Sequence, residues 1–232
     1  MRLTLADSIL LFALVAVAPA YSYYAGVRIA RGAMRNRIFA YGRTMLSWWL
    51  ISLTTLFLWW RLERPFTSLG FVVPLGPRLL LGVILCLLLL TYINGQYRVL
   101  RRLPPEKLAR IRETLGRTAV VLPHTLAEYR WFLAVSLTAG FCEELLFRGY
   151  FFAVTSQWLT IAGAALAGAV IFGLGHAYQG KRGMLKTTTA GLAFGLVYLA
   201  TGSLLWPVIL HVLVDIQGGT IGYRLLRKPL SP

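Results

Sequence analysis

The chain has 232 residues, 57% of them hydrophobic, and carries 24 Lys and Arg against 8 Asp and Glu. Soluble domains do not carry repeated apolar runs of about 20 residues, so the composition excludes an ordinary soluble domain. In a soluble chain the net charge of +16 would indicate nucleic-acid binding. Here the basic residues lie between apolar segments, so we expect them to set membrane topology and expect no nucleic-acid partner.

The first half of the chain contains three predicted spans, at about residues 5–27, 44–60 and 78–97. The first includes Ala18-Pro19-Ala20, which resembles a signal-peptidase site. Its apolar stretch is long, however, so we interpret it as an uncleaved span.

A long polar stretch at about 98–128 follows. Leu108, Ile111 and Leu115 recur at helical spacing among its basic residues. This pattern predicts either a short amphipathic helix on an anionic membrane surface or a solvated loop, and both interpretations stay open.

The second half contains four predicted spans, at about 129–152, 158–178, 187–201 and 203–222. It is rich in small residues, including Gly191 and Gly195 at a spacing that permits close helix contact. We therefore predict an all-α polytopic membrane protein with about seven transmembrane helices. Residues 1–128 would form an N-terminal scaffold of about three spans plus a basic cytoplasmic loop, and residues 129–228 a four-helix catalytic core.

Basic residues follow the first, third and fifth predicted spans and also close the chain. By the positive-inside rule this pattern places the N-terminus outside and the C-terminus in the cytoplasm. The residues are Arg28, Arg31, Arg35, Arg37 and Arg43; Arg98, Arg101, Arg102, Lys107, Arg110, Arg112 and Arg117; Lys181, Arg182 and Lys186; and Arg224, Arg227 and Lys228.

Two adjacent carboxylates and an arginine interrupt the fourth predicted span: Glu143, Glu144 and Arg148. Charged side chains at membrane depth cost roughly 2.5–3.5 kcal/mol each and usually face a protein interior or a wet cavity. Glu144 and Arg148 are four residues apart on one helix face, in the favourable order for an ion pair. Glu143 lies ~100° around the helix and is left to act as a general base. The alternative is an ionic cluster that only holds helices together.

Three histidines are available. His176 and His211 lie in predicted spans, and Asp215 follows His211 by one helical turn, so these two share a face. His124 lies in the polar stretch, where a surface role is expected.

Two chemistries fit these groups. In the first, Glu143 and His176 polarise a water for attack on a peptide carbonyl, while His211 and Asp215 stabilise the oxyanion. In the second, His176, His211 and a carboxylate bind zinc. No H-E-x-x-H spacing supports zinc and no G-x-S-x-G elbow supports a serine nucleophile, so we expect no cofactor and keep zinc as the alternative.

Three motifs carry a family resemblance: Glu143-Glu144-x-x-x-Arg148, Phe172-x-x-x-His176 and His211-x-x-x-Asp215. In this order, over about 130–220, they resemble the signature of the CAAX protease and bacteriocin-processing (CPBP, or Abi) family of intramembrane endopeptidases. The resemblance implies a helical bundle with a membrane-embedded cavity. It implies that Glu143 and His176 activate water, that His211 and residue 215 form the oxyanion site, and that the mechanism is of the glutamate type.

The last motif position differs from the common family pattern, in which Asn often stands where this chain has Asp215. An ionised aspartate cannot donate a hydrogen bond to an oxyanion. Asp215 would have to be protonated, orient His211, or bind a metal.

The resulting prediction is a membrane-embedded glutamic-type endopeptidase that acts on a membrane-associated peptide or protein. Glu144, Arg148 and Phe172 would support the site structurally, and membrane lipid is the other expected partner. The predicted location is a bacterial inner membrane, and no oligomeric state is predicted. The alternatives are a non-catalytic bacteriocin-immunity or peptide-binding protein of the same fold and a proton-coupled transporter, for which no broken-helix repeat is present.

Overall fold

The computed structural model describes residues 3–32 and 36–227, and every regular element within these ranges is a helix. This confirms the all-α prediction. The α-helices are α1 (Leu5–Phe12), α2 (Ala18–Ala30), α3 (Arg37–Arg61), α4 (Pro77–Arg102), α5 (Pro105–Thr114), α6 (Thr118–Val121), α7 (Leu126–Glu144), α8 (Phe151–Thr155), α9 (Ile161–Leu174), α10 (Lys181–Thr201) and α11 (Leu205–Leu226). The π-helical segments are η1 (Ala13–Val17) and η3 (Leu145–Tyr150), and the 3₁₀ segments are η2 (Phe66–Leu69) and η4 (Ala177–Gln179).

Three helical stretches in the described ranges are long and apolar enough to cross a membrane: Leu5–Arg28, Pro77–Arg102 and Leu205–Leu226. The predicted number of about seven is therefore not confirmed. The other predicted spans fall short for different physical reasons. α3 is long but mixes Trp, Ser and Thr with its leucines, α7 and α10 carry several charges, and α9 has only 14 residues.

The first predicted span is one helical run whose middle is π-helical. Thr4 and Asp7 form a reciprocal capping box that starts α1. Pro19 has no backbone N–H, and its ring crowds the carbonyl of Val15. The widened segment η1 lies directly before this proline, and α2 then continues to Ala30.

Two predicted boundaries are wrong. α3 begins at Arg37, well before the predicted residue 44, because the Asn36 side chain caps it by accepting from the Phe39 N–H at 3.0 Å. α9 ends at Leu174, so His176 lies in the turn after this helix and outside the span predicted over 158–178.

Small residues bring the helices of the second half together. α7 packs on α11 and α9 packs on α10. A Cβ on Gly140 would strike the Val212 side chain, and one on Gly173 would strike Thr188. The predicted close contact at Gly191 is present, since a Cβ there would lie 3.0 Å from Phe172 Cδ1. The second half is therefore a tightly packed group of helices.

The first helix and the loop after α3 are fastened to this group by a buried pair. Arg64 donates to both Asp7 carboxylate oxygens at 2.7 Å, and its guanidinium lies 4.8 Å from the centre of the Trp59 ring. The Tyr150 hydroxyl, at the end of η3, donates to the Asp7 carbonyl at 2.7 Å. Leu69 of η2 is fully buried in the same cluster.

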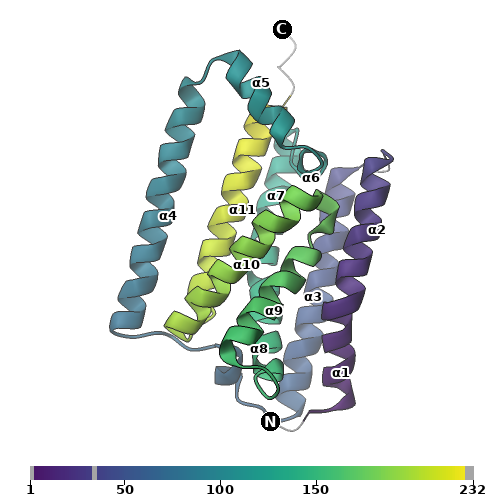
Figure 1. Ribbon diagram of the computed structural model, residues 1–232, viewed down its shortest axis with the longest axis vertical. Coiled ribbons are helices and arrows are strands. Elements are labelled where there is room, and N and C mark those ends of the chain that lie inside the picture. The colour runs from purple at the N-terminus through teal and green to yellow at the C-terminus, as the bar shows by residue number, and fades with distance from the viewer. Residues whose placement is uncertain (1–2, 33–35, 228–232) are drawn as a thin grey trace.

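α4 stands at one edge of the molecule, with α1, α2 and α3 at the other (Figure 1). Only 6% of its most apolar window is buried inside the protein. α4 touches α11 near both of its ends, where Gly82 lies against Trp206 and Gln217 donates to Gln96 at 2.6 Å. Its leucine-rich surface is therefore left for lipid.

The basic segments gather at one end of the bundle, where α2, α4 and α11 end and α5 and α6 lie (Figure 1). Arg31, Arg117 and Lys181 line one cavity there, and Arg112 and Leu226 line another. This confirms that the basic loops share one side. The side of the membrane on which they lie stays a prediction, and Arg35 and Lys228 lie outside the described residues.

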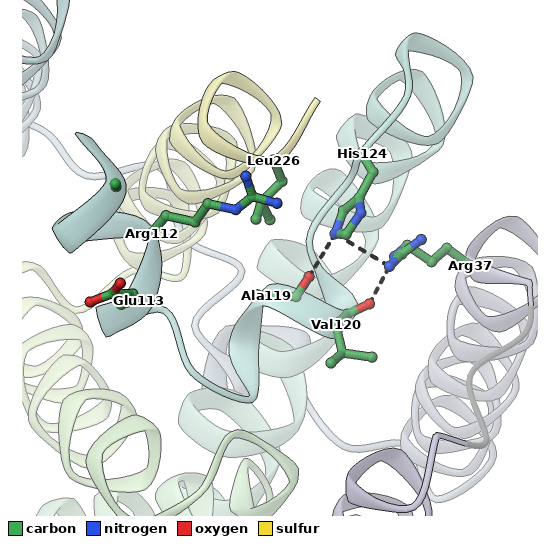
Figure 2. A pocket seen from close by; sticks show the side chains of 8 residues that line it. Arg37, Arg112, Glu113, Ala119, Val120, His124 and Leu226 are labelled. Atoms are coloured by element: carbon green, nitrogen blue, oxygen red, sulfur yellow. Dashed lines mark hydrogen bonds between the residues drawn. The ribbon is translucent and has the colours of Figure 1, made fainter. Parts of the chain in front are cut away.

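The polar stretch before α7 contains the short helices α5 and α6. Leu108, Ile111 and Leu115 are half-buried, and α5 packs against α11, so the stretch contains a helix; its place on an anionic membrane surface stays a prediction. His124 is not a plain surface residue. Figure 2 shows it facing Arg37, with its Nε2 2.9 Å from the Ala119 carbonyl while Arg37 Nε donates to the Val120 carbonyl at 2.8 Å.

Candidate active site

The two adjacent carboxylates lie at the point where α7 changes into the π-helical segment η3. Glu143 and Glu144 are the last residues of α7, and Arg148 lies inside η3. Their exposed fractions are 5%, 0% and 2%. π-helical turns are rare and often mark functional sites because they turn side chains away from the regular helical register.

Glu144 is the centre of a buried ionic network. Its Oε1 accepts from Arg148 Nη1 at 2.8 Å, which is the predicted pair, and it also lies 2.7 Å from His211 Nδ1. The carboxylate accepts from both groups, so Nδ1 of His211 carries a hydrogen. Glu144 therefore holds α7 and α11 together and fixes the ring of His211.

Arg148 is held on several sides. Its Nη2 donates to the Gly191 carbonyl at 2.7 Å, and the guanidinium lies 4.7 Å from the centre of the Phe172 ring and 5.6 Å from that of Phe194. These contacts join η3 to α9 and α10. A buried cation with this many partners is a rigid structural element.

Glu143 has a different environment from its neighbour. Its Oε2 is buried and, like Oε2 of Glu144, has no hydrogen-bond partner among the described residues, but Glu143 lacks the two donors that anchor Oε1 of Glu144. The nearest ring nitrogen is Nε2 of His176, at 4.0 Å. This distance is too long for a direct hydrogen bond and short enough for one small molecule to bond to both atoms.

The tautomer of His176 follows from its other contact. Nδ1 lies 2.8 Å from the Phe172 carbonyl, one turn back along the chain. A carbonyl can only accept, so Nδ1 donates, and in the neutral ring Nε2 is left with its lone pair facing Glu143. Phe172 thus contributes its carbonyl to His176 as well as its ring to Arg148.

His176 reaches this depth because α9 is short. At 1.5 Å per residue its 14 residues extend only ~21 Å, against ~30 Å for the apolar layer. The turn that follows α9 therefore lies within the bundle, level with the end of α7.

His211 and Asp215 lie on one face of α11, as their spacing predicts. His211 Nε2 is 3.7 Å from Asp215 Oδ2, and 32% of the Asp215 side chain is exposed. Glu144 holds the other nitrogen, so the group that orients His211 is Glu144. Asp215 lies instead at the nitrogen that faces the site.

Sequence reasoning missed three contributors. The ring of Phe194 stacks on His211 at 5.0 Å between centroids, the Gly191 carbonyl anchors Arg148, and Tyr178 lies 5.8 Å from the ring of His176. The only sequence signal for the first two is the Gly191–Gly195 spacing, which indicated close packing of that helix. Nothing in the sequence singled out Tyr178.

The zinc alternative requires at least three ligands that converge on one point. Within residues 3–32 and 36–227, no group of at least three His, Cys, Asp or Glu side chains could hold a metal ion. Nδ1 of both histidines is engaged, by Glu144 and by the Phe172 carbonyl, which leaves Nε2 of each ring as the nitrogen open to a ligand. No step below is routed through a metal.

The fold and site together define an integral membrane protein, all-helical in its described part, with a buried carboxylate–histidine centre. Residues 125–217 match the family model described as type II CAAX prenyl endopeptidase Rce1-like, of the CPBP family. The match includes all three motifs and confirms the resemblance that they carry. The model that these residues match describes CAAX-type prenyl endopeptidases.

Comparison with curated proteins and with solved structures gave no significant match.

Proposed function

We propose that the protein hydrolyses a peptide bond of a membrane-associated protein or peptide, with Glu143 as general base on a water molecule. The observation that carries the proposal is that two hydrogen-bond acceptors face each other across a gap that one water molecule can bridge. The unpartnered Oε2 of Glu143 lies 4.0 Å from Nε2 of His176. Two acceptors cannot hydrogen-bond to each other, but one water can donate to both.

A water held in this way keeps its lone pairs for attack. Glu143 takes one proton as the water oxygen bonds to the peptide carbonyl carbon, and His176 holds the second hydrogen in place. When the tetrahedral intermediate collapses, the carbon–nitrogen bond breaks and the proton on Glu143 passes to the leaving amine. The products are a carboxylic acid and an amine, so atoms and protons balance.

His211 is proposed to stabilise the oxyanion. Its Nδ1–H is engaged by Glu144, so donation to an oxyanion requires a second hydrogen on Nε2. Three carboxyl groups and one arginine lie in the cluster, and a positively charged His211 reduces this imbalance. The negative charge that develops on the substrate oxygen then faces a cation in a largely buried site.

Asp215 is proposed to support this charge. An ionised Asp215 at 3.7 Å favours the cationic ring of His211 without replacing Glu144 as its anchor. In this role it needs no proton of its own, which accommodates an acid at a position where Asn is common.

The test compares cells that lack the gene with cells that carry wild type, Glu143→Gln or Glu106→Gln at equal membrane expression. Glu106 is an exposed carboxylate on α5 and serves as the matched control. N- and C-terminal peptides of membrane and secreted proteins are scored by mass spectrometry. A specific cleavage should appear with wild type and Glu106→Gln and be absent with Glu143→Gln.

The opposite result has a clear meaning. If the Glu143→Gln variant reverses the effect of the deletion as fully as wild type does, then Glu143 is not a base and the proposal fails. The protein would then act by binding a peptide or membrane partner, which is the immunity-type alternative.

A further inference from the structure

A second feature of the molecule is a basic cavity at the end of the bundle where the basic segments gather. Its volume is ≈ 990 Å³, and α2, the turn between α5 and α6, η4 and the start of α10 enclose it. Five cationic residues and one acid, Glu113, line it. The cations are Arg31, Arg117, Lys181, Arg182 and Lys186.

These cations are not paired with acids in the part of the chain that the structure describes. None of the five forms an ion pair with any residue in the described ranges. Arg117 lies against the first turn of α10, since a Cβ on Gly180 would be 3.6 Å from its Cδ. Like charges crowded in this way repel one another, and a bound anion would relieve the repulsion.

The backbone adds to this positive field. α10 begins at Lys181 after Gly180, and no side chain caps its first N–H groups. The partial positive charge of a helix start therefore faces the same space as the lysine and arginine side chains. Gly180 has φ +82°, which leaves no side chain over the turn.

The remaining wall is amphipathic. Tyr23 and Val27 come from α2, just before the apolar stretch Leu5–Arg28 ends, and Leu115 and Met184 line the cavity as well. Tyrosine near the end of a span marks the level of lipid headgroups. Cations and apolar groups thus meet at the depth where a phospholipid has its phosphate and the first part of its chains.

We propose that this cavity binds the phosphate headgroup of an anionic phospholipid. The phosphodiester oxygens accept from Arg117, Lys181 and Arg182, and the acyl chains leave past Tyr23 and Val27 into the bilayer. Basic pockets between helices at this depth suit such headgroups. Ala177, the neighbour of His176, lines the cavity, but Glu143 and His176 do not, so the proposal does not depend on proteolysis.

The test uses the full chain purified in a neutral detergent. Retained lipid is counted by native mass spectrometry, and thermal unfolding is followed with added phosphatidylglycerol, phosphatidylcholine or inorganic phosphate. The site variant is Arg117→Gln/Lys181→Gln/Arg182→Gln. The control variant, Arg98→Gln/Arg102→Gln/Arg110→Gln, removes the same charge from exposed positions that do not line the cavity.

Wild type and the control variant should retain phosphatidylglycerol and unfold at a higher temperature in its presence than with phosphatidylcholine. The site variant should bind it roughly 100-fold more weakly. Equal binding by the two variants overturns the proposal. Equal protection by inorganic phosphate assigns the site to free phosphate and also overturns the lipid proposal.

Discussion

The Nδ1 atom of His211 lies 2.7 Å from Oε1 of Glu144, on the same oxygen that accepts from Arg148. The two neighbouring carboxylates at the end of α7 therefore have different hydrogen-bond partners. Both have a buried Oε2 without a hydrogen-bond partner among the described residues, but Oε1 of Glu144 accepts from two buried donors, whereas the nearest ring nitrogen to Glu143 is Nε2 of His176 at 4.0 Å. Glu144 therefore has a structural role, and Glu143 is left for the proposed chemistry.

Glu144→Ala should lower the free energy of unfolding by about 3–5 kcal/mol, because it leaves Arg148 buried without its carboxylate. Glu143→Gln should leave stability nearly unchanged, since it removes a charge that no described residue pairs with. Thermal or denaturant unfolding in detergent, followed by tryptophan fluorescence, measures both. Equal destabilisation by the two variants would mean that the pair forms one structural cluster.

Gly191→Ala should destabilise the protein by about 1–3 kcal/mol. The added methyl would lie 3.0 Å from Phe172 Cδ1 and 3.3 Å from Arg148 Nη2, so it would push α9 and α10 apart at the site. The same measurement applies. Gly218→Ala is the control, because that helical glycine of α11 has open space around it, and the change should be neutral or stabilising by up to about 1 kcal/mol.

Asp7→Ala should lower stability by about 3 kcal/mol, because it removes both hydrogen bonds to Arg64 and the bond from the Thr4 N–H. Asp7→Asn keeps an acceptor oxygen and should cost less. Glu63→Gln changes an exposed acid of the adjacent loop and should have little effect. A ranking with Glu63→Gln as costly as Asp7→Ala would show that this buried pair is not what fastens α1.

Cleavage should persist in the presence of a strong chelator, at a rate close to that of untreated protein. The proposed base is a carboxylate, and within residues 3–32 and 36–227 no group of three His, Cys, Asp or Glu side chains is arranged to hold a metal ion. The measurement is the rate of the cleavage found in the paired-cell experiment, combined with elemental analysis of the purified protein. If the chelator abolished cleavage and added zinc restored it, the zinc-dependent mechanism would be supported instead.

The sequence was most informative where charged or polar residues stand four apart on one helix. The Glu144–Arg148 pair and the shared face of His211 and Asp215 follow from a spacing of four residues, and both are present. The gathering of basic loops at one end follows from charge alone. Such features depend on short stretches of chain, which local patterns describe well.

The sequence could not give contacts that depend on how separate helices meet. Nothing local indicates that Glu144 takes His211 as a second partner, that Phe194 stacks on that ring, or that η3 is π-helical. The early end of α9 was missed because Gly173, Gly175 and the apolar residues around them extend the hydrophobic pattern past the point where hydrogen bonding stops. These features are fixed by packing across long separations in sequence.

The hydrogen bond from Tyr150 to the Asp7 carbonyl limits how the chain could be shortened or joined to parts of another protein. The stretch that matches the family begins at residue 125, yet Leu145 and Tyr150 are buried in one cluster with Trp59 and Leu69, which precede it. A fragment that began at residue 125 would expose that surface and its polar groups to lipid. The leading helices therefore cannot be exchanged like a detachable module, and chimeras should keep the loop after α3 together with the first helix.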